Sequence, residues 1–189
     1  SLPTVNADNR KVLALYVDAS ELTATGNTGT NEGNGISVSH YLRLTGKIDL
    51  EGESQLIQST DSDLDVIGLG AIERDQQGTA DTFTYNYWSA PVGETDTATN
   101  DYSYTVQDIM LDGTSSINFL ASGYNGAATS PVGIADYWIW KFANLTSDDY
   151  SAWQHVRRTG TINAGEGFTM KGPGTGSIIT DQNYVFLGK

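Results

Sequence analysis

A six-residue rhythm of apolar residues constrains the fold of the first half of the chain more than any other feature. Two interleaved series follow it: Ile36, Leu42 and Ile48, and Val38, Leu44, Leu50 and Leu56. Polar residues alternate with these positions, which indicates short strands with one buried and one solvated face. Gly46 and Gly52 keep the same spacing and supply the backbone freedom that tight turns need.

This rhythm predicts a β-solenoid-like part over residues 1–79, in which short strands stack coil on coil and share one core. A meander of short hairpins has the same pattern and stays open as the alternative. Further β-rich runs at 12–17, 22–25, 64–66 and 69–72 suit either arrangement.

Residues 80–189 are predicted to form an aromatic-rich, β-sandwich-like module, which can also join the first part in one continuous unit. Aromatic residues recur there at strand spacing, as in Tyr85 and Tyr87, and in the stripe of Trp138, Trp140 and Phe142. One short helix is expected over residues 148–157, with Ser147 as its N-cap and arginines in its last turn. The predicted fold class is therefore all-β with one short helix.

Four short peptides in the second half carry a resemblance to a known family. Residues 85–92 read YNYWSAPV, residues 138–142 WIWKF, residues 165–172 GEGFTMKG and residues 183–189 NYVFLGK. In this order they resemble large secreted proteins of the Bacteroidetes, chiefly flavobacteria, which the type IX secretion system exports. The resemblance implies an extracellular or cell-surface location and implies no particular activity.

Members of that family continue beyond the lysine that corresponds to Lys189 and end in a sorting domain. The chain is therefore expected to be a processed or excised piece of a longer protein.

The charge balance excludes several classes of partner. The 189 residues include 23 Asp and Glu against 10 Lys and Arg, which gives a formal net charge of −13. Nucleic acids and anionic lipids need clustered cations, so neither is an expected partner. No apolar run is long enough to span a bilayer, and membrane insertion is not expected.

The chain has no cysteine, which excludes disulfides and thiolate metal sites.

One candidate metal site follows from spacing. Asp61, Asp63 and Asp65 alternate as the ligands of calcium loops do. The loop lacks the glycine and the final glutamate of an EF-hand, so a solvated acidic turn explains the same residues. No cofactor other than calcium is expected, and zinc is excluded because two histidines cannot complete a typical site.

Catalytic motifs are missing from the sequence. There is no G-x-S-x-G elbow, and His155 lies beside two arginines, a setting that favours a surface residue over a catalytic base. Glu166 stands between two glycines, where a turn residue with inward-packing neighbours Phe168 and Met170 is the simpler interpretation. A polysaccharide-acting enzyme would need two paired carboxylates in a cleft, at least one with a raised pKa.

Aromatic residues offer a candidate glycan-binding site. Exposed rings stack on sugars, and the candidates are Trp88, Trp138, Trp140 and Trp153. Tryptophans are also common core residues, so burial of three or more of the four would exclude a sugar platform. Thr97, within Asp96-Thr97-Ala98, matches the acceptor triplet of Bacteroidetes O-glycosylation.

These observations predict a non-enzymatic structural or adhesive module of a larger secreted protein. Its partners would be neighbouring domains or copies of itself, because solenoid ends expose unpaired strand edges that favour self-assembly. A carbohydrate-binding module that recognises surface glycans is the alternative, and a polysaccharide-acting enzyme is the third hypothesis.

Overall fold

The structure is a computed structural model that describes residues 4–5, 10–18, 20–67, 69–94, 103–142 and 149–189. It confirms the all-β class: strands predominate, and the only α-helix among these residues is α1 (Val106–Ile109). The chain divides into two compact units, unit 1 (Ser1–Asp75 with Leu187–Lys189) and unit 2 (Gln76–Phe186). Within the described part, no helix has the length and apolar character needed to cross a membrane.

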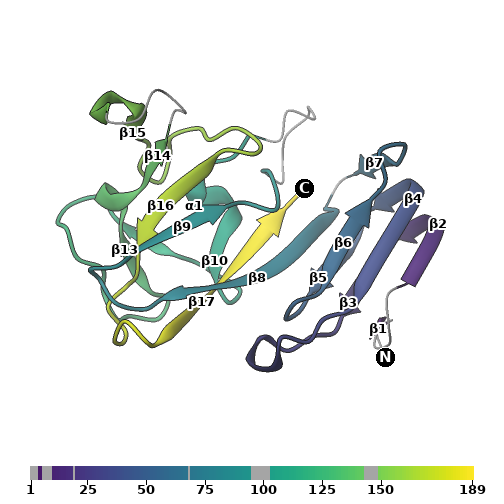
Figure 1. The fold of residues 1–189 in the computed structure, drawn as a ribbon, viewed down its shortest axis with the longest axis horizontal. Helices are drawn as coiled ribbons and strands as arrows, with labels where there is room; N and C mark the ends of the chain where they lie inside the picture. Colours follow the sequence, from purple (N-terminus) through teal and green to yellow (C-terminus); the bar gives the residue numbers. More distant parts are fainter. Residues whose placement is uncertain (1–3, 6–9, 19, 68, 95–102, 143–148) are drawn as a thin grey trace. The chain divides into compact units, whose positions relative to one another are not determined.

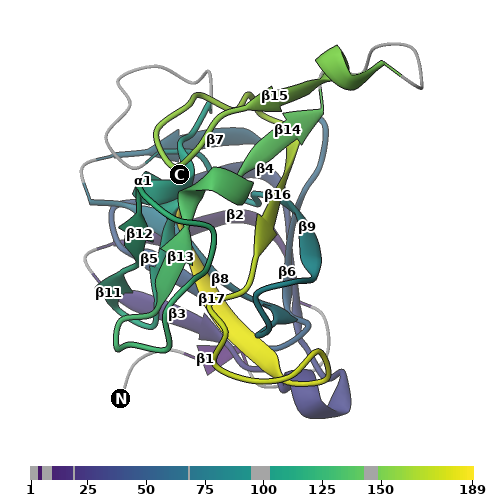
Figure 2. The ribbon, with the colours of Figure 1, turned by 90° about the vertical axis from the view of Figure 1, so that its left-hand side faces the viewer.

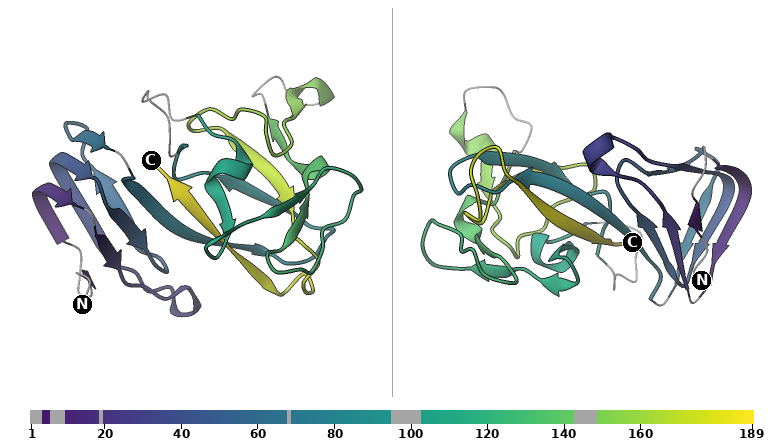
Figure 3. Two further views of the ribbon diagram at one scale, coloured as in Figure 1. Left: turned by 180° about the vertical axis from the view of Figure 1, so that it is seen from behind. Right: turned by 90° about the horizontal axis from the view of Figure 1, so that it is seen from below.

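Unit 1 is built from parallel strands that pair with strands one turn further along the chain (Figure 1, Figure 3). The run β1-β3-β5-β8 is part of a seven-stranded sheet with the order β1-β3-β5-β8-β17-β10-β11, and the other sheet has the order β2-β4-β6, with β7 also paired to β4. The bounds are β1 (Thr4–Val5), β2 (Arg10–Val17), β3 (Glu21–Ala24), β4 (Gly35–Leu44), β5 (Lys47–Leu50), β6 (Gln55–Gln58), β7 (Asp63–Val66) and β8 (Ala71–Thr79), with a 3-10 turn η1 (Thr28–Thr30) between β3 and β4.

The register of these pairs places like residues in columns. Ile48 on β5 pairs with Leu22 on β3 and with Ile72 on β8. Leu42 on β4 pairs in the same way with Leu15 and Leu64. The buried members of these columns form a single apolar core: Val17, Ala24, Ile36, Val38, Leu42, Leu44, Ile48 and Leu50. Alternation along each strand therefore becomes a shared core only because the strands stack in register.

The six-residue rhythm does not mark separate strands throughout. Ile36 and Leu42 lie on one ten-residue strand, β4, with no turn between them. Turns do follow at the two glycines, for different reasons. Gly52 adopts a φ of +58°, the left-handed region that favours glycine. At Gly46 a Cβ atom would lie 2.0 Å from the Ser20 carbonyl oxygen, so close backbone approach requires glycine there.

Unit 2 contains an antiparallel sheet of four strands with the order β15-β14-β16-β9 (Figure 2). Its strands are β9 (Tyr85–Ser89), β14 (Trp140–Phe142), β15 (Trp153–His155) and β16 (Gly167–Lys171). β17 (Asp181–Gly188) pairs with β10 (Met110–Asp112), which pairs with β11 (Ser115–Ser116), and β12 (Asn118–Leu120) pairs with β13 (Gly133–Ala135). Two 3-10 turns, η2 (Asp136–Trp138) and η3 (Tyr150–Ala152), precede β14 and β15.

The predicted helix over residues 148–157 is wrong where the structure describes it. Residues 150–152 form the 3-10 turn η3, and residues 153–155 form β15, which pairs with β14. Arg157, expected in the last helical turn, has a φ of +53°, which no α-helix accommodates. Strand pairing with β14 satisfies this backbone and outweighs the local preference for a helix. Ser147, the expected N-cap, lies outside the described residues.

Asp49 is a carboxyl group of unit 1 whose environment opposes ionisation. It lies on β5 next to Glu73 of β8, and burial, together with the charge of Glu73, raises the pKa of Asp49 to about 6. Because this pKa exceeds the ordinary value of about 4, the group stabilises the fold below pH 4, and that contribution is lost as the pH rises through 6.

We therefore expect Asp49→Asn to raise the free energy of unfolding at pH 7.5 by about 1–2 kcal/mol, a value reduced for the solvent that screens this partly exposed group. The difference should vanish at pH 4. Urea unfolding followed by far-UV circular dichroism measures it, in calcium-free buffer, with the exposed Asp63→Asn as the matched control. A variant no more stable than wild type at pH 7.5 would contradict the prediction.

Candidate aromatic binding face

One face of the four-stranded sheet in unit 2 is covered by exposed aromatic side chains. The register sets Tyr87 of β9, Thr169 of β16, Trp140 of β14 and His155 of β15 in one row across the sheet. Residues opposite one another in antiparallel strands point to the same side, and so do residues two apart on one strand. We call this surface the aromatic face; it comprises Tyr85, Tyr87, Trp140, Phe142, Trp153, His155, Gly167 and Thr169.

The other side of the same sheet forms part of the core of unit 2. Phe168 and Met170 on β16 are 2% and 0% exposed. Trp88 on β9 is buried beside them, with its ring centroid 5.5 Å from that of Tyr184 and 5.8 Å from that of Phe186. Alternation along β9 and β16 therefore separates a packed side from an aromatic side.

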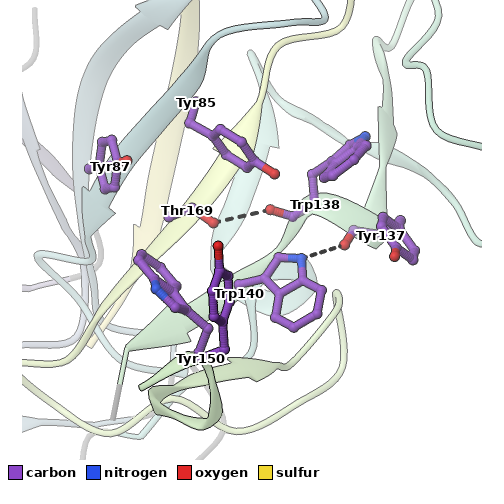
Figure 4. Close-up of a pocket in the computed structure, with 8 residues that line it drawn as sticks. Tyr85, Tyr87, Tyr137, Trp138, Trp140, Tyr150 and Thr169 are labelled. Atoms are coloured by element: carbon purple, nitrogen blue, oxygen red, sulfur yellow. Dashed lines mark hydrogen bonds between the residues drawn. The ribbon is translucent and has the colours of Figure 1, made fainter. Parts of the chain in front are cut away.

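The centre of the aromatic face is a groove, because its middle strand carries small residues. β16 contributes Gly167 and Thr169 to this side, while β9 and β14 on either side contribute Tyr87 and Trp140. Two cavities of about 310 and 540 Å³ share four lining residues and so form one continuous groove: Tyr87, Trp140, Trp153 and Thr169. In Figure 4 the rings of Tyr85, Tyr87, Trp138 and Trp140 surround Thr169.

Hydrogen bonds to the backbone hold the groove in its shape. The indole N–H of Trp140 donates to the Tyr137 carbonyl oxygen at 2.8 Å, and that of Trp138 donates to the Tyr124 carbonyl oxygen at 2.6 Å. The Thr169 hydroxyl donates to the Trp138 carbonyl oxygen at 3.2 Å (Figure 4). Since the indole N–H groups are satisfied internally, the tryptophans offer their ring faces to a ligand.

Contacts between aromatic rings also hold the side chains of the groove in place. His155 stacks on Trp140 at a centroid distance of 4.2 Å and an interplanar angle of 10°. Phe142 and Trp153 meet edge to face at 5.3 Å. Burial, with smaller contributions from Tyr87 and Tyr137, raises the pKa of Tyr85, so its hydroxyl stays protonated at neutral pH.

Charged side chains lie at the two ends of the groove. Lys171 places its Nζ 3.7 Å from the centre of the Trp138 ring and 4.6 Å from that of Tyr85, in cation–π contact. At the other end, Lys141 Nζ lies 2.8 Å from Glu166 Oε2. Hydrogen bonds from Lys141 and from the Asn163 N–H hold the pKa of Glu166 below its ordinary value.

This environment bears on the catalytic hypothesis. Glu166 is the only carboxylate among the described residues that line the two cavities, and it is held ionised. Its neighbours Phe168 and Met170 pack inward, as expected for a turn residue at this position. Asp49, whose pKa is raised, lies on a strand of unit 1 and lines neither cavity.

The four candidate tryptophans have different environments. Trp88 is 6% exposed and belongs to the core, Trp138 and Trp140 are half-buried, and Trp153 is 38% exposed. The condition that would exclude a sugar platform, burial of three or more, is therefore not met. The aromatic stripe expected over residues 138–142 is divided: Trp138 comes from η2, and only Trp140 and Phe142 share the strand β14.

Sequence reasoning did not single out the tyrosines as ligand-binding residues. Tyr87 is 75% exposed and Tyr150 is 92% exposed, and both line the first cavity. The alternation of Tyr85 and Tyr87 with buried Trp88 was visible in the sequence, but which side faced solvent was not. Tyr150 joins the site because η3 carries it there, which no periodicity indicated.

The three aspartates predicted as a calcium site lie in unit 1. Asp61 is exposed in a turn, and Asp63 and Asp65 follow on β7. Asp65 Oδ2 already accepts a hydrogen bond from the Tyr41 hydroxyl at 2.9 Å. Throughout the described ranges, no group of three or more His, Cys, Asp or Glu side chains is arranged to hold a metal ion. Calcium binding stays a prediction, and so does glycosylation at Thr97, which lies outside the described residues.

Asp136 anchors the turn that supplies Tyr137 and Trp138. It is 0% exposed at the start of η2, and its two oxygens lie 2.9 Å from Arg157 and 2.6 Å from Arg158. Asp136 is enclosed by the two arginines and lines neither cavity of the groove. Its role is to fix η2 against the segment that follows β15.

We expect Asp136→Ala to lower the free energy of unfolding by about 2–4 kcal/mol, because two arginines lose their buried partner while they retain partial access to water. Urea unfolding followed by tryptophan fluorescence checks this, since all four tryptophans lie in unit 2. The exposed Asp181→Ala serves as the control and should change stability by less than about 0.5 kcal/mol. Equal stability of the two variants would disprove the anchoring role.

Comparison of the chain with protein-family models, with curated proteins and with solved structures gives no match. The functional conclusion therefore depends on the geometry of the aromatic face.

Proposed function

We propose that this chain is a non-enzymatic, extracellular or cell-surface adhesion module whose unit 2 binds carbohydrate. The observation that carries the proposal is the groove of the aromatic face. Its Tyr87 and Trp153 rings are exposed, and an internal hydrogen bond holds the half-buried Trp140 ring. Binding pockets of this size combine apolar walls with a few placed polar groups. Sugar rings suit such walls because their C–H faces stack on aromatic rings while their hydroxyls stay in water.

A second part of the proposal concerns unit 1. The in-register parallel columns support its interpretation as a solenoid-like scaffold that carries the binding unit. The resemblance to exported Bacteroidetes proteins supports a setting outside the cell, where surface glycans are the available partners. Glu166 is the one carboxylate among the described residues that line the groove, and its ion pair with Lys141 supports a binding role over hydrolysis.

Removal of rings from either wall of the groove should abolish glycan binding. We expect Tyr87→Ala on β9 and Trp153→Ala on β15 each to weaken the affinity for a bound glycan at least tenfold, or about 1.4 kcal/mol. Both residues are exposed, so the fold should tolerate the changes. A glycan array followed by isothermal titration calorimetry measures the effect.

The matched control is Phe83→Ala, which removes an aromatic ring that is 80% exposed and lines neither cavity. Its affinity should stay within about twofold of wild type. Failure of the wild-type chain to bind any glycan, or equal losses in Phe83→Ala, would contradict the proposal.

Self-assembly is the second candidate function, and the free edge of β2 favours it. In the described part of the chain, β2 pairs with β4 alone, so the backbone groups along its other edge have no strand partner. Leu13 and Tyr16 on this strand are 65% and 56% exposed. Such an edge can accept a strand from a neighbouring domain or from a second copy.

If copies pair through this edge, size-exclusion chromatography with light scattering should detect oligomers that grow with protein concentration. Leu13→Lys should shift the population to the monomer, because a charged side chain blocks edge pairing. Ile179→Lys, at a 90% exposed position of unit 2, should not. A wild-type monomer at all concentrations would overturn self-assembly by this chain.

A further inference from the structure

We infer that the groove recognises a neutral, unbranched chain of β-linked sugars in the gluco configuration, with every ring substituent equatorial. This inference rests on the proposed function and names the ligand class of the same site. Three properties of the groove carry it: its straight course, its two aromatic walls and the lack of a charged side chain among the described residues that line the first cavity.

The straight course follows from the strand that forms the floor. Gly167 and Thr169 lie two residues apart on β16 and form a straight stretch of floor about 7 Å long, slightly more than the length of one sugar ring. Gly167 and Thr169 line the second cavity, and Thr169 continues into the first. An extended β-linked chain follows such a floor, whereas the helical chain of an α-linked glucan turns away from it.

The width suits one sugar ring between two aromatic rings. Tyr87 and Trp140 both pair with Thr169, from the strands on either side of β16. Adjacent strands lie about 4.8 Å apart, so the two walls start about 10 Å apart at the backbone. Carbon atoms in contact are about 3.5–4.0 Å apart, so a flat ring with a contact on each side needs about 7–8 Å.

Because the groove has two aromatic walls, an aromatic ring contacts each of the two faces of a bound sugar ring. In a gluco-configured ring both faces carry only C–H bonds. In a manno- or galacto-configured ring one axial hydroxyl projects from a face, and an aromatic ring pressed against that hydroxyl offers it no hydrogen-bond acceptor of ordinary strength. Burial of a hydroxyl without a hydrogen-bond partner costs binding free energy. The axial hydroxyl therefore weakens binding whether it meets the Tyr87 ring or the Trp140 ring.

Charge selects a neutral ligand. The described residues that line the first cavity are seven aromatic residues and one threonine, without a charged side chain. Lys171 lies at the edge of this cavity, where the Trp138 and Tyr85 rings hold its Nζ in cation–π contact. Glu166, at the edge of the second cavity, is neutralised by Lys141. The chain carries a formal net charge of −13, which repels polyuronates and sulfated glycans.

The test compares hexasaccharides of one length by isothermal titration calorimetry with the whole chain. We expect the β-1,4-linked glucose hexamer to bind at least tenfold more tightly than the β-1,4-linked mannose and galactose hexamers, the α-1,4-linked glucose hexamer and an oligouronate. Equal or tighter binding of any of these would overturn the inference and leave the proposed glycan binding intact. No binding of any oligosaccharide, here or on the array, would overturn both.

A floor substitution tests the groove without removing a ring. Gly167→Leu should weaken binding of the glucose hexamer at least tenfold, because a side chain there fills the second cavity. Ser116→Leu, at an exposed position on β11, is the matched control and should bind as wild type does. Matching circular dichroism spectra establish that both variants fold. Unchanged affinity in Gly167→Leu would place the ligand elsewhere and overturn the inference.

Discussion

The antiparallel pairing of β16 with β9 and β14 is the interaction on which the proposed site depends. It directs Phe168 and Met170 into the core and leaves Gly167 and Thr169 as the floor of the groove. The same pairing aligns Tyr87 and Trp140 on either side of that floor. A shift of one residue in this register would bury the tyrosines and expose the core, so stability and ligand binding depend on one set of backbone hydrogen bonds.

The two units solve the burial problem of β-strands differently. In unit 1 parallel strands stack like residues over one another, and Ile48 is fully buried between Leu22 and Ile72. In unit 2 Trp88 packs against the buried rings of Tyr184 and Phe186, while the 3-10 turn η2, anchored by Asp136, brings Tyr137 and Trp138 to the groove. The regular architecture of unit 1 suits the scaffold role that we propose for it, and the irregular, aromatic-rich architecture of unit 2 suits the proposed binding role.

Local sequence patterns predicted the structure correctly where the residues of a single segment determine it. The alternation that makes this an all-β protein was readable, as were the turn at Gly52 and the inward packing of Phe168. Prediction from sequence was wrong where pairing with another strand determines the secondary structure. Residues 153–155 were predicted to lie inside a helix over residues 148–157, yet they form β15 because they pair with the edge of β14. The six-residue rhythm likewise does not divide β4, because β4 pairs with β2 on both sides of a shift in register between Val12 and Ala14.

The sequence by itself determined the class of fold, the acidic and cysteine-free surface, and the supply of aromatic residues from which a site could be made. Only the tertiary structure decided which rings are buried and which are exposed. The reason is physical: alternation states that neighbouring residues point to opposite sides, but it does not state which side meets the core. Register across β9, β16, β14 and β15 decides that, and it joins residues more than sixty positions apart, such as Tyr87 and Trp153, into one groove.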